Sequence, residues 1–145
     1  MSGIILTDID GCVLDWEFGF HTWMQCHGHN PVEDGVDHYS MAEHYGLSLD
    51  VSRSLCRTFN ESAAIGFLPP LRDAQYYIKL LHEKHRYQFV AVTSLSKDPS
   101  AQKLRIRNLC KIFGPNTFVD HVFLDTGADK DEVLAQLAEK YPGHM

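Results

Sequence analysis

The sequence predicts an α/β fold: a Rossmann-like, three-layer arrangement around a parallel sheet, with a small helical cap inserted near its start. Two features predict this class. Short apolar runs alternate along the chain with segments of helical periodicity, and each apolar run ends in polar residues. Strands that alternate with helices form right-handed βαβ units around a parallel sheet, and the buried strands of such sheets are continuous apolar runs.

Three apolar runs are the expected strands. Ligands of an open α/β sheet bind beyond the carboxyl ends of its strands, so the polar residues that follow these runs should converge on one site. The runs and their polar ends are residues 3–7 with Asp8 and Asp10, residues 88–92 with Thr93 and Ser94, and residues 120–124 with Asp125.

The helices of this core are expected from apolar residues that recur every three or four positions. Asp98 and Pro99 give a start signal and Gly114 a stop signal for the middle helix. A capping-box-like start at residues 129–132 precedes the last one. The apolar faces are Leu71, Ala74, Ile78 and Leu81; Ile106, Leu109, Cys110 and Phe113; and Leu134, Leu137, Ala138 and Tyr141.

Residues 16–68 interrupt the alternation, because they show helical patterns at roughly 17–27 and 49–60 and no strand pattern. We expect them to form a helical cap over the carboxyl edge of the sheet, with residues 1–15 and 69–145 as the core. Four aromatic side chains of this insert either belong to its core or stack on a substrate base. They are Phe18, Phe20, Trp23 and Tyr45.

The composition is that of an ordinary globular protein, with 44% hydrophobic and 22% charged residues among 145. A net charge of −6 argues against a broad basic surface for extended nucleic acid. The N-terminal apolar run is too short for a signal peptide, and no run is long enough to span a membrane. Four cysteines lie far apart without a CxxC pair. These features predict a soluble cytoplasmic protein with free thiols.

The first strand end carries the residues on which the functional hypothesis depends. Asp8 is placed to attack phosphorus and bind Mg²⁺, and Asp10 to donate a proton to the leaving oxygen. Gly11 permits the tight turn between them and the ligand. The Thr93 hydroxyl and a lysine ammonium would hold the phosphoryl oxygens, and Mg²⁺ would neutralise charge between carboxylate and phosphate. The alternative is a strand-end turn that uses Asp-Gly chemistry.

These residues resemble the motifs of the haloacid dehalogenase (HAD) superfamily. Its first motif, DxDGxxxD after an apolar strand, is matched by Asp8, Asp10, Gly11 and Asp15. Its second motif, a strand ending in Thr or Ser, is matched at Thr93, with Ser94 beside it. Its third, a lysine near a helix start, is best matched by Lys130, with Lys103 as the alternative. The first motif is the specific part of the resemblance, which covers most of the chain.

The resemblance implies an aspartyl-phosphate intermediate and a Mg²⁺ ion. The superfamily holds this ion with the first aspartate's carboxylate, the second aspartate's main-chain carbonyl and an acidic residue of a fourth motif. At Asp8 and Asp10 the first two ligands are present. The helical insert and residues 67–74 are similar to the 5′(3′)-deoxyribonucleotidases and related phage-encoded hydrolases. A small phosphorylated substrate, with nucleoside monophosphates favoured, is therefore expected, in the host cytoplasm if the protein is phage-encoded.

The fourth motif is the departure from the superfamily pattern, because the sequence ends at Met145, about where its strand would begin. The C-terminal strand or strands of the fold are therefore expected to be missing, and Asp125 is the one substitute ligand at a strand end. Two alternatives stay open: a sugar-phosphate phosphatase or phosphomutase, and a catalytically incomplete HAD-like binding module.

Two further groups are expected to be ordinary surface residues. The nine histidines include His27 and His29, but no cysteine partner is spaced for a transition-metal site. Arg105 and Arg107 are expected on a solvated helix face.

Overall fold

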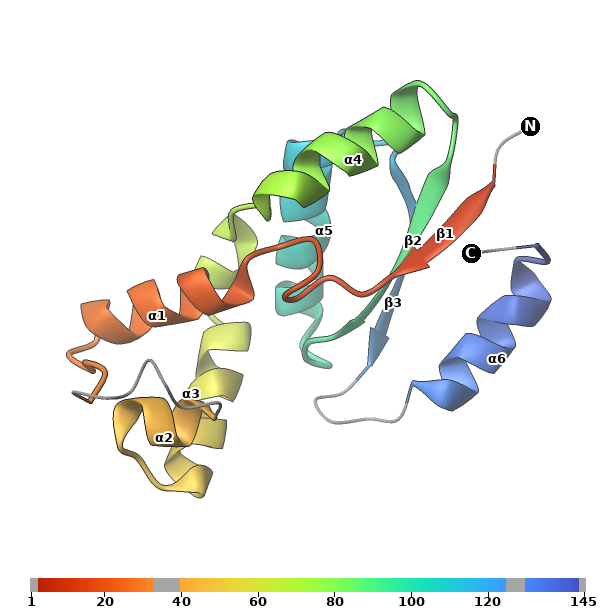
Figure 1. Ribbon diagram of the computed structural model, residues 1–145. Coiled ribbons are helices and arrows are strands. Elements are labelled where there is room, and N and C mark those ends of the chain that lie inside the picture. The colour runs from red at the N-terminus through yellow and green to blue at the C-terminus, as the bar shows by residue number, and fades with distance from the viewer. Residues whose placement is uncertain (1–2, 33–39, 125–129, 144–145) are drawn as a thin grey trace.

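A computed structural model describes residues 3–32, 40–124 and 130–143 of the chain. Figure 1 shows a sheet flanked by helices, with a group of helices beyond one end of it. The elements are β1 (Ile4–Thr7), α1 (Trp16–Cys26), α2 (Met41–Tyr45), α3 (Leu49–Asn60), the 3₁₀ helix η2 (Ala63–Phe67), α4 (Arg72–Glu83), β2 (Gln88–Ser94), α5 (Pro99–Phe113), β3 (Phe118–Leu124) and α6 (Asp131–Lys140).

The sheet has three strands in the order β1-β2-β3, and both pairings are parallel. The register places Thr7 beside Ala91 and Thr93 beside Phe123, so the three strands end at the same edge. This confirms the predicted α/β class with a parallel sheet. All three predicted strands are present, and β3 begins at Phe118, two residues before the predicted start.

The side chains of β2 alternate between two hydrophobic cores. Phe89 and Ala91 belong to the larger core, which also contains Ile78 of α4 and Leu109 of α5. Val90 and Val92 pack on the other side with Leu137 of α6. Helices α4 and α5 therefore cover one face of the sheet and α6 the other, which gives the three layers seen in Figure 1.

The helix ends show how local sequence sets the boundaries. Asp15 caps α1 by accepting a hydrogen bond from the Phe18 N–H, and Ser48 caps α3 in the same way. Helix α5 begins at Pro99 and ends before Gly114, as predicted, although the Asp98 side chain makes no capping bond. Helix α6 begins at Asp131.

Helices α1, α2, α3 and η2 occupy the insert between β1 and α4. The predictions near 17–27 and 49–60 are confirmed as helices, within one residue at the ends of the first. Helix α2 and η2 were not predicted, because five residues are too few to show helical periodicity. The division into a core of residues 1–15 and 69–145 and a cap of residues 16–68 stays a prediction.

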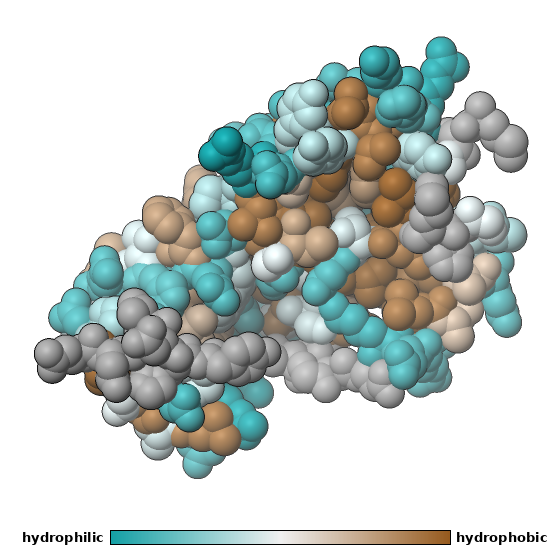
Figure 2. Space-filling model, viewed as in Figure 1, coloured by the Kyte–Doolittle hydropathy of each residue, from teal (hydrophilic) through white to brown (hydrophobic). Residues whose placement is uncertain are grey.

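Strand β1 forms one edge of the sheet, and its apolar residues are only half-buried. Figure 2 shows hydrophobic surface between α4 and α6, in the region where Figure 1 places this strand. None of the four cysteines forms a disulfide, as predicted. Within the described residues, no helix has both the length and the apolar character needed to cross a membrane.

Candidate functional site

A tight turn after β1 sets the geometry of the first motif. The Ile9 carbonyl accepts hydrogen bonds from the backbone N–H groups of Cys12, Val13 and Leu14, and the Gly11 N–H donates to the Leu14 carbonyl at 2.9 Å. Gly11 has a φ of 75°, a left-handed conformation that favours glycine. The turn therefore needs glycine at this position, as the sequence predicted, and it keeps Asp8 and Asp10 at the carboxyl end of β1.

Asp8 lies at the mouth of the sheet edge, and 51% of its side chain is exposed. Its Oδ1 accepts a hydrogen bond from the Ile9 N–H at 2.9 Å and lies 3.0 Å from Lys130 Nζ. Both residues line a cavity of about 140 Å³ whose other walls are Leu6, Thr7, Val92 and Leu134. The structure thus brings together the predicted nucleophile and the predicted lysine, which are 122 positions apart in the sequence.

Asp10 has a different environment, because it contacts a buried arginine. Arg105 Nη2 forms an ion pair with Asp10 Oδ1 at 2.7 Å. Arg105 Nη1 donates a hydrogen bond to Thr93 Oγ1 at 3.0 Å. Both Arg105 and Thr93 have no exposed surface. One guanidinium therefore links the predicted proton donor to the predicted phosphate-binding hydroxyl.

The prediction that Arg105 lies on a solvated face is wrong. Arg105 is four positions before Leu109 and four after Ala101, and both of these are buried, so it lies on the inward stripe of α5. The predicted apolar face had been placed one position away, at Ile106, which is only half-buried. Arg107 is exposed, as predicted. The sequence signal was the four-residue spacing from Ala101 through Arg105 to Leu109.

The environment of Asp10 also changes its acidity. Burial raises the pKa of the Asp10 carboxyl, the Arg105 guanidinium opposes that rise, and the charge of Asp8 adds to it. The net direction is upward from the ordinary value. A raised pKa favours the protonated form, which is the form that a general acid needs.

The other residues predicted for the site do not all lie near Asp8. Ser94 ends β2 and is half-buried. Asp15, the last position of the first motif, caps α1. Lys103, the alternative to Lys130, is exposed on α5, and no contact to either aspartate is found for it in the described structure. Asp125 lies outside the described residues.

The donor groups at the strand end suit a hard divalent cation. Mg²⁺ binds oxygen, keeps several waters and commonly takes one or two carboxylates together with substrate phosphate oxygens. Asp8 offers an exposed carboxylate, and Asp10 stands two positions on in the same turn. Across residues 3–32, 40–124 and 130–143, no group of three or more His, Cys, Asp or Glu side chains is arranged to hold a metal. A cation here would therefore rely on these aspartates, main-chain oxygen, water and ligand.

The cap aromatics divide between core and surface. Phe20 and Tyr45 are buried, and Phe20 stacks on Trp16 with ring centroids 4.8 Å apart. Phe18 is 60% exposed and, with Trp23, lines an apolar cavity of about 350 Å³ between α1 and η2. The core interpretation therefore holds for Phe20 and Tyr45, and base stacking remains a hypothesis for Phe18 and Trp23.

Two polar contacts hold the end of α3, one to the loop after β2 and one within the insert. Buried Ser96, just after β2, donates to Glu61 Oε1 at 2.9 Å, and Trp16 Nε1 donates to Asn60 Oδ1 at 2.8 Å. The first contact joins the loop after the second motif to the end of α3. Neither contact was predicted from the sequence.

Two cap histidines lie together. The His21 and His44 ring centroids are 4.5 Å apart, and His21 Nδ1 hydrogen-bonds the Tyr45 hydroxyl. Burial lowers the pKa of His21, and the neighbouring His44 lowers it further. We therefore interpret the hydrogen bond between His21 and Tyr45 as part of the packing of the insert.

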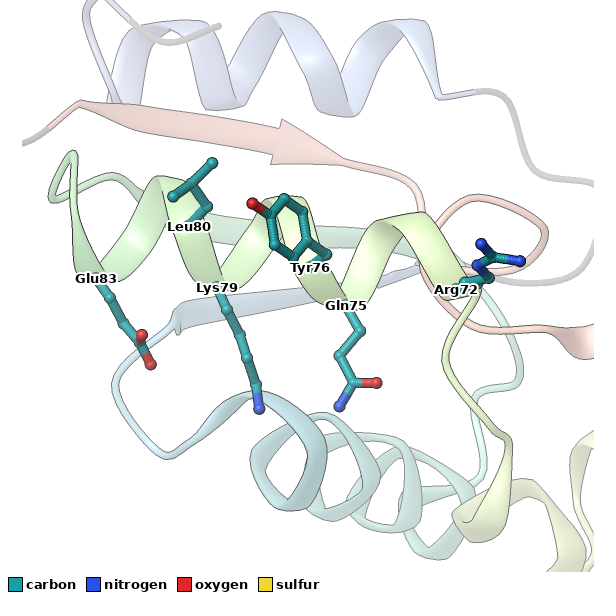
Figure 3. A pocket seen from close by; sticks show the side chains of 6 residues that line it. All are labelled: Arg72, Gln75, Tyr76, Lys79, Leu80 and Glu83. Carbon is teal, nitrogen blue, oxygen red and sulfur yellow. The ribbon is translucent and has the colours of Figure 1, made fainter.

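A larger cavity, of about 460 Å³, lies along α4. Figure 3 shows Gln75, Lys79 and Glu83 pointing toward α5, while Arg72 lies beside the loop that follows β1. All of its lining residues belong to α4, and none lies at a strand end. The candidate site is therefore the smaller cavity at Asp8.

Comparisons with known proteins agree with this architecture. No protein-family model matches the chain. The chain is 31% identical over 147 residues to an uncharacterized 32.4 kDa protein in the Gp30-rIII intergenic region of Enterobacteria phage T4, covering 97% of this chain and 51% of that protein. It thus spans about half the length of this relative.

Among solved structures, the chain is similar to a haloacid dehalogenase-like family hydrolase from Streptococcus pneumoniae. The TM-score is 0.58 and the identity 17%, with 96% of this chain and 70% of that chain covered. The fold is therefore HAD-like, as predicted. The finer resemblance to 5′(3′)-deoxyribonucleotidases stays a prediction.

Proposed function

We propose that this chain carries the nucleophile of a Mg²⁺-dependent phosphomonoester hydrolase that works through an aspartyl-phosphate at Asp8. The observation that supports this most is the half-exposed Asp8 carboxylate, which lies 3.0 Å from Lys130 Nζ in a cavity at the carboxyl end of β1. An accessible carboxylate beside a fixed cation is suited to attack on an electron-poor phosphorus atom.

In the proposed reaction Asp8 attacks phosphorus and the ester oxygen leaves with a proton from Asp10. Water then hydrolyses the acyl phosphate with Asp10 as general base. Ser94 and the Gly11 turn are proposed to contact the phosphoryl oxygens, and Lys130 to stabilise their charge. Thr93, which is wholly buried and bound to Arg105, is proposed to act behind them rather than to touch the ligand. Mg²⁺, held by Asp8 and Asp10, would neutralise charge between carboxylate and phosphate.

Nucleoside monophosphates are the substrate class we favour, on the resemblance of the insert and of residues 67–74 to the 5′(3′)-deoxyribonucleotidases. A sugar-phosphate phosphatase or phosphomutase is the alternative with the same chemistry. A catalytically incomplete HAD-like binding module is a further alternative, because no group of three or more potential metal-ligating side chains is found among the described residues.

The decisive variant is Asp8→Asn. We expect it to abolish Mg²⁺-dependent release of phosphate from an aryl phosphate, because an amide is not a nucleophile toward phosphorus. The matched control is Asp73→Asn, an exposed aspartate of α4, which should keep parental turnover. Undiminished activity in Asp8→Asn would refute the mechanism.

A substrate panel then separates the alternatives. Nucleoside monophosphates and sugar phosphates are compared at equal concentration, with and without EDTA. A preference for nucleotides supports the favoured class, and a preference for sugar phosphates supports the first alternative. Mg²⁺ binding without turnover of any ester would support the binding module.

A further inference from the structure

We propose that Arg105 is a positioning residue of this site, which holds the Asp10 carboxylate and the Thr93 hydroxyl in a fixed relation to each other. This inference rests on the proposed function and assigns a role to a residue outside the three motifs. It is carried by two contacts of one guanidinium: Nη2 at 2.7 Å from Asp10 Oδ1, and Nη1 at 3.0 Å from Thr93 Oγ1.

The geometry suits a rigid bridge. A guanidinium is planar and rigid, so a hydrogen bond from Nη1 to Thr93 and an ion pair of Nη2 with Asp10 limit how far the two partners can move relative to each other. Arg105 is wholly buried, and only 23% of the Asp10 side chain is exposed, so little water competes for these contacts. The bridge joins the turn after β1 to the end of β2 through α5.

Stability alone gives a poor account of this arrangement. A buried arginine is costly to desolvate, and its cost is best offset when every N–H has a partner. Arg105 Nε is buried without a hydrogen-bond partner, and Nη2 meets Asp10 as an ion pair without a hydrogen bond. An apolar side chain at this inward position of α5 would avoid these costs. The arginine is therefore better explained by what it holds at the sheet edge.

The first test measures turnover in Arg105→Met and Arg105→Lys, with Arg107→Met as control on the exposed face of the same helix. Aryl phosphate hydrolysis with Mg²⁺ is followed well below each unfolding midpoint. We expect Arg105→Met to lower kcat by roughly tenfold to a hundredfold, because a misplaced reacting group is costly. KM should change by less than about threefold, since contacts that bind the substrate remain.

Arg105→Lys should fall between the parent and Arg105→Met, because an ammonium keeps the charge but is a point donor without the planar fork. Arg107→Met should match the parent. Equal kcat in all folded variants would show that Arg105 only supports the fold and would overturn the proposal.

The second test is a double-mutant cycle that compares thermal unfolding midpoints and does not depend on turnover. Asp10→Asn leaves a buried guanidinium without its counter-charge, so it should lower the unfolding midpoint of the parent by on the order of 10 °C. In the Arg105→Met background the same change should have almost no effect. If Arg105→Met does not fold, Arg105→Lys takes its place, with a smaller loss of coupling.

The two tests distinguish failure of the proposed function from failure of the proposed bridge. Absence of turnover in the parent protein would refute the proposed function, whereas the cycle reports on the contacts of Arg105 in either case. Additive effects of the Asp10 and Arg105 changes would overturn the bridge itself.

Discussion

The two faces of the sheet are packed unequally, and each supplies one cation to the carboxyl end of β1. On the face covered by α4 and α5, a large core surrounds Arg105, which is wholly buried and contacts Asp10. On the face covered by α6, three residues form the buried core, and Lys130 meets Asp8 at the surface. One aspartate of the motif is therefore fixed by the interior, while the other is left accessible to a ligand.

This difference supports the two tasks that the proposed function gives to the carboxylates. A group that attacks a ligand has to be reached by it, and Asp8 is half exposed. A group that transfers a proton needs a fixed position and a shifted pKa, and burial gives Asp10 both. The unequal packing thus has a chemical consequence at the site.

The largest expected effect on stability comes from a cavity in the better-packed face. Leu109 of α5 is wholly buried, so Leu109→Ala should lower the free energy of unfolding by about 4 kcal/mol, through lost burial and a residual cavity. Leu137→Ala on α6, whose buried partners among the described residues are Val90 and Val92, should cost about 2 kcal/mol because the site collapses more easily. Urea titration of both variants measures the difference. Equal losses of stability would contradict the conclusion that the two faces of the sheet are packed unequally.

The second prediction compares the two ion pairs. Asp10→Asn should lower the free energy of unfolding by about 3 kcal/mol, because it leaves the buried Arg105 charge unpaired. Asp8→Asn should change it by less than about 0.5 kcal/mol, because exposed pairs contribute little. Urea titration measures both losses. Addition of 0.5 M NaCl should weaken the exposed pair of Asp8 and Lys130 and leave the buried pair of Asp10 and Arg105 unchanged. A large cost in Asp8→Asn would mean that Asp8 has a structural role.

Much of this arrangement follows from sequence. Apolar runs that end in Asp8 and Thr93 predict strands with a shared carboxyl edge, since parallel strands end on the same side. That rule and the motif resemblance together predicted that Lys130 and Asp8 belong to one site, although 122 positions separate them in the sequence. The glycine of the turn was predictable because a tight turn after a strand often needs a left-handed residue, and Gly11 has a φ of 75°.

The burial of Arg105 was missed because a charged residue on a helix is usually solvated, although its four-residue spacing from Ala101 and Leu109 indicated the inward face of α5. Its burial depends on partners from two other elements, Asp10 and Thr93, and no local pattern shows that they meet. Helix α2 and η2 were missed for a different reason: elements of five residues carry too few positions for a period. The capping serine before α2 was the available signal.

The smallest expected effect concerns pH and the better-packed face. His121 of β3 stacks between Phe118 and Phe123, and burial lowers its pKa below the ordinary 6.5, with Asp120 opposing the shift. Below pH 6.5 the unfolded chain binds a proton that folded His121 does not, so stability should fall as pH decreases from 7 toward 5. His121→Leu should make this decline shallower, and His85→Leu, at an exposed turn, should leave it unchanged.

The measurement is the urea midpoint at several pH values in that range. His21 in the cap has a pKa lowered by burial as well, so a part of the decline should persist in His121→Leu. On the opposite face, Asp120 accepts hydrogen bonds from Lys140 and Tyr141, which lower its pKa, so this contact is lost only at pH values below the ordinary 3.8. The two faces therefore respond to acid in separate windows, and an identical slope in the parent and His121→Leu would show that the histidine does not stay neutral in the folded protein.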